Sequence, residues 1–246
     1  SMEDYHMSNL GEELNEQAVA CARRAIERFY NEGGQAPKFI AGSVGPTNKA
    51  ASLSPDVNNP GYRAVTFDEL KNIYYEQCVA LIDAGVDILL IETVFDTLNA
   101  KAALFAAQDA IEAGDKEVEI MLSGTITDAS GRTLSGQTTE AFLISVSHSP
   151  LLSIGLNCAL GAKQLMPYLQ TLDAKAPFAV SAHPNAGLPN AFGEYDETPE
   201  QMAAQIKDYL DLNLINIIGG CCGTSPAHIK AIADLSKNYN PRTYEH

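Results

Sequence analysis

Six short apolar runs recur along the chain, and a stretch with helical spacing of its apolar residues follows each of them. The runs cover residues 38–44, 86–92, 118–126, 151–158, 177–183 and 214–221. Within a run the apolar residues stand side by side instead of alternating with polar ones, which is typical of strands buried on both faces of a parallel sheet. The pattern therefore predicts an α/β protein with about six strand–helix units.

Several segments between the runs carry signals for a helix start. Thr66 stands three residues before Glu69, which is the spacing of a capping box. The pairs Thr198-Pro199 and Ser225-Pro226 place a proline at the first position of a helix. Apolar positions in residues 10–29 also repeat at helical intervals, so we expect a helix before the first strand.

The order of strand, long loop and helix is that of a (β/α)8 TIM barrel, in which the loops after the strands build the active site. The count is two units short of eight, which would leave two sheet edges unpaired and the core uncovered on one side. We therefore expect the amino-terminal part to have been removed, or a second polypeptide to complete the barrel, or two copies to exchange strands.

Composition narrows the function classes. The chain has 246 residues with 46% hydrophobic content and no long uncharged apolar run, which fits one globular domain without a membrane span. A formal net charge of −15 would repel nucleic acid and anionic lipid surfaces, so neither is an expected partner. Five scattered cysteines and the lack of a secretory signal indicate a reducing compartment, and we expect a cytoplasmic protein.

Three cysteines lie at the ends of two predicted strands. Cys158 closes the fourth run, Cys221 closes the sixth, and Cys222 follows it directly. Strand ends of a barrel share one face, so these thiols are expected to meet in a metal site with one open position, an arrangement that suits activation of a thiol substrate. Buried packing residues, or a disulfide between the adjacent pair, are the alternatives.

The other candidate ligands are less favoured. Cys21 and Cys78 stand on helical patterns and are expected to be ordinary core residues. His148 and His183 are not chosen as metal ligands, because three thiolates and a substrate sulfur already complete a tetrahedron.

Six segments of the chain resemble a known family. They are residues 41–47 (Ala-Gly-Ser-Val-Gly-Pro-Thr), 53–56 (Leu-Ser-Pro-Asp), 87–93 (Asp-Ile-Leu-Leu-Ile-Glu-Thr), 155–158 (Gly-Leu-Asn-Cys), 184–189 (Pro-Asn-Ala-Gly-Leu-Pro) and 219–224 (Gly-Gly-Cys-Cys-Gly-Thr). In this order they resemble the homocysteine-binding domain of cobalamin-dependent methionine synthase. The wider family is that of the zinc-dependent homocysteine S-methyltransferases.

The resemblance implies that residues 1–246 are a homocysteine-binding barrel domain. Zinc would be held by the cysteines at 158, 221 and 222, with the homocysteine sulfur as fourth ligand, and methylcobalamin would donate the methyl group that makes methionine. Glu92 would bind the substrate amino group. Ser43 and Asn185 are further candidates for substrate binding, and for both a role in fixing a loop stays open.

The sequence also departs from the family pattern. The 246 residues do not contain the family's first strand, with its Asp-Gly-Ala-Met-Gly type of turn, or its second strand–helix unit. The resemblance therefore predicts a fragment of a larger enzyme, whose folate- and cobalamin-binding domains would be its partners. A betaine or S-methylmethionine donor and a non-catalytic remnant are the alternatives, and the Ser-Val-Gly-Pro and Leu-Ser-Pro-Asp segments favour the cobalamin group.

Overall fold

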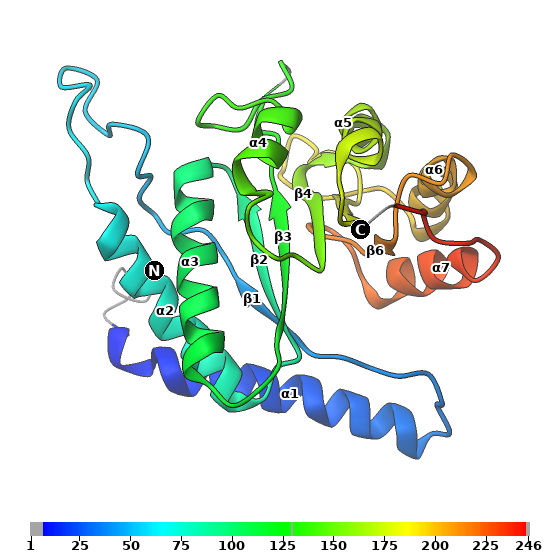
Figure 1. Cartoon of the computed structure of the whole chain (residues 1–246). Helices are drawn as coiled ribbons and strands as arrows, with labels where there is room; N and C mark the ends of the chain where they lie inside the picture. The colour runs from blue at the N-terminus through cyan, green and yellow to red at the C-terminus, as the bar shows by residue number, and fades with distance from the viewer. Residues whose placement is uncertain (1–6, 129, 245–246) are drawn as a thin grey trace. The chain divides into compact units, whose positions relative to one another are not determined.

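A computed structural model describes residues 7–128 and 130–244 of the chain (Figure 1). In these residues the strands are β1 (Ala41–Val44), β2 (Ile88–Val94), β3 (Glu119–Gly124), β4 (Ser153–Gly161), β5 (Ala179–Asn185) and β6 (Ile217–Ile218). The helices are the short 3-10 helix η2 (Ser8–Leu10) and the α-helices α1 (Gly11–Asn31), α2 (Phe67–Ala84), α3 (Thr97–Ala113), α4 (Thr139–Val146), α5 (Ala162–Lys175), α6 (Pro199–Asp211) and α7 (Pro226–Ser236).

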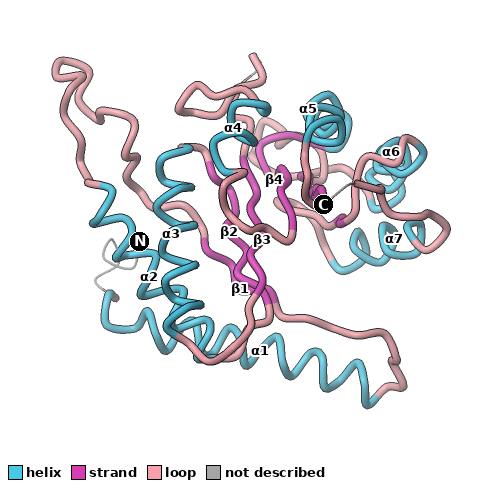
Figure 2. Tube along the Cα trace, viewed as in Figure 1, coloured by secondary structure: helices cyan, strands magenta, loops and turns pink. Residues whose placement is uncertain are grey.

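The strands of the described residues form one sheet in chain order, β1-β2-β3-β4-β5-β6. Figure 2 labels the first four of these strands. The pairs β1–β2, β4–β5 and β5–β6 are parallel. Parallel strands in chain order with a helix between neighbours are the wall of a TIM barrel, so the predicted fold class is confirmed as a partial barrel. Among the described helices, none combines the length and the apolar content that crossing a bilayer requires.

The chain divides into two compact units. The first unit comprises residues 1–92 and 98–121, and the second comprises residues 93–97 and 122–246. In the first unit α1 packs against α2. Helix α2 begins with the predicted capping box, in which Thr66 Oγ1 accepts a hydrogen bond from the Glu69 N–H and the Glu69 carboxylate accepts one from the Thr66 N–H.

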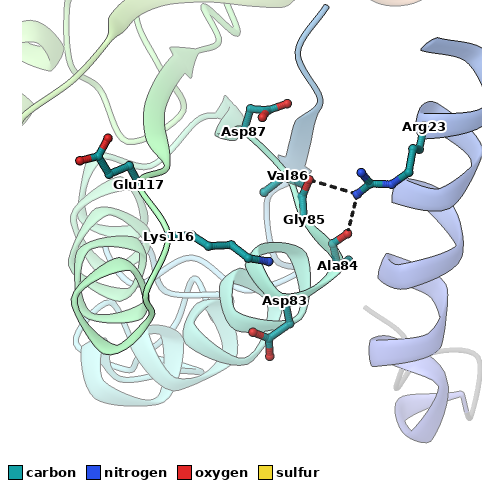
Figure 3. A pocket seen from close by; sticks show the side chains of 8 residues that line it. All are labelled: Arg23, Asp83, Ala84, Gly85, Val86, Asp87, Lys116 and Glu117. Carbon is teal, nitrogen blue, oxygen red and sulfur yellow. Dashed lines mark hydrogen bonds between the residues drawn. The ribbon is translucent and has the colours of Figure 1, made fainter. Parts of the chain in front are cut away.

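Two cations hold the other end of α2. Arg23 of α1 donates from Nη2 to the carbonyl oxygens of Ala84 (3.0 Å) and Gly85 (3.4 Å), as Figure 3 shows. Lys116 Nζ donates to the Ile82 carbonyl at 3.0 Å. The last carbonyls of a helix carry partial negative charge and have no partner within the helix, so these contacts stabilise the helix end. The polar pocket of Figure 3 is therefore built around a helix cap.

In the second unit the helices pack in chain order, α4 on α5, α5 on α6 and α6 on α7. Residues 153–157 of β4 are all buried, as the continuous apolar run predicts. Helix α6 starts with a capping box at Thr198, and α7 starts after the N-cap Ser225, so both predicted helix starts are confirmed.

A buried arginine near the end of the chain fastens the carboxyl end of α5. Arg242 is only 6% exposed, and its Nε donates to Asp173 Oδ1 at 2.7 Å. Its remaining guanidinium nitrogens donate to the carbonyl oxygens of Asp173, Ala176 and Phe178 at 2.7–3.0 Å. One side chain thus satisfies a carboxylate and three backbone acceptors.

Element boundaries differ from the apolar runs in both directions. Strands β2, β4 and β5 continue past the ends of their runs, and in β2 and β5 the added residues include polar ones, Thr93 and Asn185, that a hydropathy pattern does not register. Strands β1 and β6 are shorter than their runs. The prediction that Cys21 is a core residue was wrong, since it is exposed on α1, whereas Cys78 is fully buried as predicted.

Replacement of Arg242 by alanine leaves Asp173 and three backbone carbonyls without their donor. We expect the free energy of unfolding to fall by about 3 kcal/mol, because three backbone carbonyls and a partly exposed carboxylate lose a charged donor, and one unsatisfied buried acceptor costs about 1–3 kcal/mol. Urea denaturation of the Arg242→Ala chain measures the change. The exposed Arg24 on α1 supplies the control, and Arg24→Ala is expected to change stability by less than about 0.5 kcal/mol. Equal losses in the two variants would contradict this role.

Candidate metal centre

The three cysteines at the strand ends meet in the second unit. The Sγ atoms of Cys158, Cys221 and Cys222 all lie within 4.8 Å of one another, with 3.6 Å between Cys158 and Cys222 and 4.0 Å between Cys221 and Cys222. Among the described residues this is the one group of three or more histidine, cysteine or acidic side chains spaced for a metal ion. Neither His148 nor His183 belongs to it.

The sulfur separations fit a tetrahedral metal. Zinc–sulfur bonds of about 2.3 Å at tetrahedral angles place two sulfur atoms about 3.8 Å apart. The separations of 3.6 Å between Cys158 and Cys222 and of 4.0 Å between Cys221 and Cys222 lie on either side of this value. Disulfide sulfurs would be about 2 Å apart, so the alternative of a disulfide within the adjacent pair is not what the structure contains. Three sulfurs occupy three corners of a tetrahedron and leave one for a further ligand.

The end of β4 turns sharply to present Cys158. Cys158 and Ala159 have φ values of 62° and 59°, in the left-handed region that residues with a side chain rarely adopt. The register between β4 and β5 shifts between Asn157 and Gly161, at the same place. Backbone strain of this kind persists only where the surrounding contacts hold it, and here it directs a thiol out of a buried strand.

The loop after β6 is hydrogen-bonded to the end of β5 and to the first residue of the loop that follows β5. Cys221 N–H donates to the Pro184 carbonyl (2.9 Å), and Cys222 N–H donates to the Asn185 side-chain oxygen (3.0 Å). In return the Ala186 N–H donates to the Cys222 carbonyl at 2.9 Å. These three bonds fix both cysteines without involving their sulfur atoms, so the thiols stay available for a ligand.

Glycines give this loop its shape. Gly223 has a φ of 77°, and a Cβ on it would stand 2.3 Å from the Cβ of Tyr195. A Cβ on Gly219 would stand 2.6 Å from Cδ2 of His183. The Gly-Gly-Cys-Cys-Gly sequence is therefore required by close approach on both sides of the cysteines and by the left-handed turn that follows them.

The thiols are held in surroundings that disfavour free thiolates. Burial, followed by repulsion from Cys158, raises the pKa of Cys221 to about 12. Burial also raises the pKa of Cys158 above its ordinary value, while a hydrogen bond from the Ala159 N–H acts in the opposite direction. Three adjacent thiolates thus require a cation, and a bound divalent metal would displace the thiol protons.

The predicted substrate residues fall in separate places. In the first unit the Ser43 hydroxyl donates a hydrogen bond to the carboxylate of Glu92, which is half-buried at the end of β2. Asn185 lies in the second unit, where its side chain is buried and binds the Cys222 N–H. The structure thus shows a loop-fixing contact for Asn185, and substrate binding by all three residues stays a prediction.

Two residues beside the sulfurs were missed in the sequence. Asn157 donates from Nδ2 to Cys221 Sγ at 3.8 Å, and Tyr195 lies close enough to Cys222 for the two groups to affect each other's ionisation. Desolvation, followed by the charge of Cys222, raises the pKa of Tyr195, which keeps its phenol protonated. The sequence did contain a signal for Asn157, because an amide next to Cys158 in a buried strand needs hydrogen-bond partners. Tyr195 lies in a loop, and nothing in the sequence around it indicated a place near the cysteines.

Known proteins share this fold. The apo form of the homocysteine methyltransferase MmuM from Escherichia coli is 25% identical, with a TM-score of 0.66 over 92% of this chain and 73% of that chain. The metallated form is 24% identical, with a TM-score of 0.66 over 91% and 70% of the two chains. The oxidized form is 23% identical, with a TM-score of 0.70 over 91% and 70%.

The sequence comparison reaches almost the whole chain. The sequence model of the homocysteine S-methyltransferase family matches residues 1–236. The matched region contains all three clustered cysteines, as well as Ser43 and Glu92. The resemblance found in the sequence motifs is thus confirmed at the level of the family. The protein accordingly belongs to the homocysteine S-methyltransferase family and is a methyltransferase.

Proposed function

We propose that this chain methylates homocysteine at a zinc ion held by Cys158, Cys221 and Cys222. The observation that carries the proposal is the trio of sulfur atoms within 4.8 Å, spaced for three corners of a tetrahedron. A structural zinc site has four protein ligands, whereas three leave a corner for the sulfur of the substrate. Zinc, when bound there, supplies a Lewis acid that keeps a thiol deprotonated at neutral pH.

The residues of the chain do the positioning. The strained turn at Cys158 and the backbone hydrogen bonds of Cys221 and Cys222 fix the positions of three ligand sulfurs. They thereby fix the direction of the fourth, vacant corner of the tetrahedron. In the reaction the homocysteine sulfur forms a bond to the methyl carbon while the bond between that carbon and the donor breaks. A fixed sulfur direction favours the in-line approach that this displacement requires.

Glu92 is proposed to bind the amino group of homocysteine. Its carboxylate lies at the end of a parallel strand, which is where barrel enzymes place substrate contacts. The hydroxyl of Ser43 donates to this carboxylate and so restricts its orientation. A carboxylate and an ammonium group form a charge-assisted hydrogen bond, which selects an amino acid over a simple thiol.

Methylcobalamin is the methyl donor that we propose, carried on another domain of a larger protein in which residues 1–246 are the homocysteine-binding barrel. The support is the resemblance of the Ser-Val-Gly-Pro and Leu-Ser-Pro-Asp segments to the cobalamin-dependent group. Betaine and S-methylmethionine remain the competing donors, and a remnant without activity is the competing role.

Single cysteine replacements test the metal ligands. We expect Cys158→Ser, Cys221→Ser and Cys222→Ser each to lose zinc affinity by more than about 100-fold, because loss of a supporting residue alone costs about 10–100-fold. Cys21→Ser and Cys78→Ser are the matched controls and should retain one zinc per chain. Zinc content after dialysis against a graded chelator measures the affinities. Equal loss in all five variants, or in none, would show that the assignment is wrong.

A comparison of donors tests the reaction. Zinc-loaded chain is incubated with homocysteine and, separately, with methylcobalamin, betaine or S-methylmethionine, and methionine is quantified by mass spectrometry. We expect methionine with methylcobalamin, and none when Cys222→Ser replaces the wild-type chain. Methionine formed only from betaine or S-methylmethionine would reassign the donor. Zinc binding without methionine from any donor would favour the remnant.

A further inference from the structure

One buried amide connects the cysteine cluster to the strands beside it. The side chain of Asn157, 1% exposed, lies in the second unit and makes four hydrogen bonds. Its Oδ1 accepts from the Thr93 N–H at 2.9 Å and from the Ser123 hydroxyl at 2.7 Å. Its Nδ2 donates to Thr93 Oγ1 at 2.8 Å and to Cys221 Sγ at 3.8 Å.

These contacts use every hydrogen-bonding position of the amide. A primary amide has two N–H donors and one oxygen with two lone pairs, and each of them has a partner here. The orientation of the amide is therefore set by its surroundings, because exchanging its oxygen and nitrogen would oppose the Thr93 and Ser123 donors. It follows that an N–H, and not the carbonyl oxygen, points at Cys221.

The strained backbone of Thr93 is a further reason why the Asn157 amide is held in this orientation. Its φ of 58° is in the left-handed region, which is unfavourable for a β-branched residue. The Asn157 amide binds both the backbone N–H and the hydroxyl of Thr93, and so offsets this strain. The same residue is the chain neighbour of Cys158, which is itself left-handed. The Asn157 side chain thus connects the strained turn at Thr93 with Cys221 Sγ, and Asn157 itself directly precedes the strained turn at Cys158.

We propose that Asn157 is a positioning residue of the metal centre, whose amide N–H donates a hydrogen bond to the Cys221 thiolate when a metal is bound. The N–H fixes the direction of the Cys221 lone pairs and withdraws charge from that sulfur. It thereby leaves more positive charge on the metal for the incoming substrate sulfur. This inference rests on the proposed metal site and adds to it a group that is not a ligand.

Other groups of polar side chains give weaker support for a binding site. The pocket of Figure 3 has two cations, but both already bind the carbonyls of a helix end, and three carboxylates share its lining. The hydroxyl group of Ser181 is buried without a hydrogen-bond partner in the described residues, yet nothing beside it identifies a ligand.

Cobalt substitution tests the proposal with a spectroscopic readout. Asn157→Asp keeps the oxygen that faces Thr93 and Ser123 but replaces the N–H by an acceptor. We expect its sulfur-to-cobalt charge-transfer bands to shift to lower energy, and its cobalt affinity to fall by about tenfold or more. Asn216 is the control, since its amide binds the backbone of Val180 and Arg242 and contacts no sulfur. Asn216→Asp should leave the bands unchanged.

A second measurement on the wild-type chain avoids any dependence on folding of a variant. The protein is loaded with a magnetically active cadmium isotope, and the side-chain amide protons are recorded by NMR. We expect scalar coupling from cadmium to an amide proton of Asn157, transmitted through the N–H···S bond, and none to Asn216. Absence of coupling at Asn157 would overturn the inference.

The outcomes separate this inference from the proposed function. A wild-type chain that gives no cobalt–thiolate bands would overturn the three-cysteine site, and the inference with it. Normal bands in the wild type that stay unchanged in Asn157→Asp would overturn the inference alone. Shifted bands in Asn157→Asp with unshifted bands in Asn216→Asp would support it.

Discussion

The proposed site depends on bringing three sulfur atoms into one small volume. Buried thiols resist ionisation, and each thiolate formed raises the cost of the next, as the high pKa of Cys221 indicates. A divalent cation reverses this balance, because its charge offsets the repulsion and the desolvation together. Without a metal the three thiols therefore stay protonated and are weak nucleophiles, whereas with a bound cation they are suited to act as ligands. The vacant corner is what allows chemistry at that metal.

The fold holds the sulfurs through the backbone. Parallel strands bring their carboxyl ends to one face, but the ends of β4 and β6 would not by themselves direct three side chains at one point. The left-handed residues Cys158 and Gly223 bend the chain, and hydrogen bonds between Cys221 and Cys222 on one side and residues 184–186 on the other fix the bend. Strain at functional positions is expected where neighbouring contacts maintain it, and Asn157 supplies such contacts.

The sequence predicted those parts of the structure that follow from periodicity and position. The six strands, the helix starts at Thr66 and Thr198 and the convergence of the three cysteines were all accessible, because buried strands and helix caps have local signatures. The exposure of Cys21 was not predictable from helical spacing, which shows which residues share a face but not whether a partner covers that face. The position of Asn157 beside Cys158 was a local signal that it needs hydrogen-bond partners, but its partners come from distant segments, and no local pattern marks Tyr195.

X-ray absorption at the zinc edge tests the central claim most directly. The zinc-loaded chain is measured with and without homocysteine, and the sulfur neighbours at about 2.3 Å are counted. The account predicts three sulfur atoms and one lighter neighbour before addition, and four sulfur atoms afterwards. Fewer than three sulfur atoms at the start, or a coordination shell that homocysteine leaves unchanged, would contradict it.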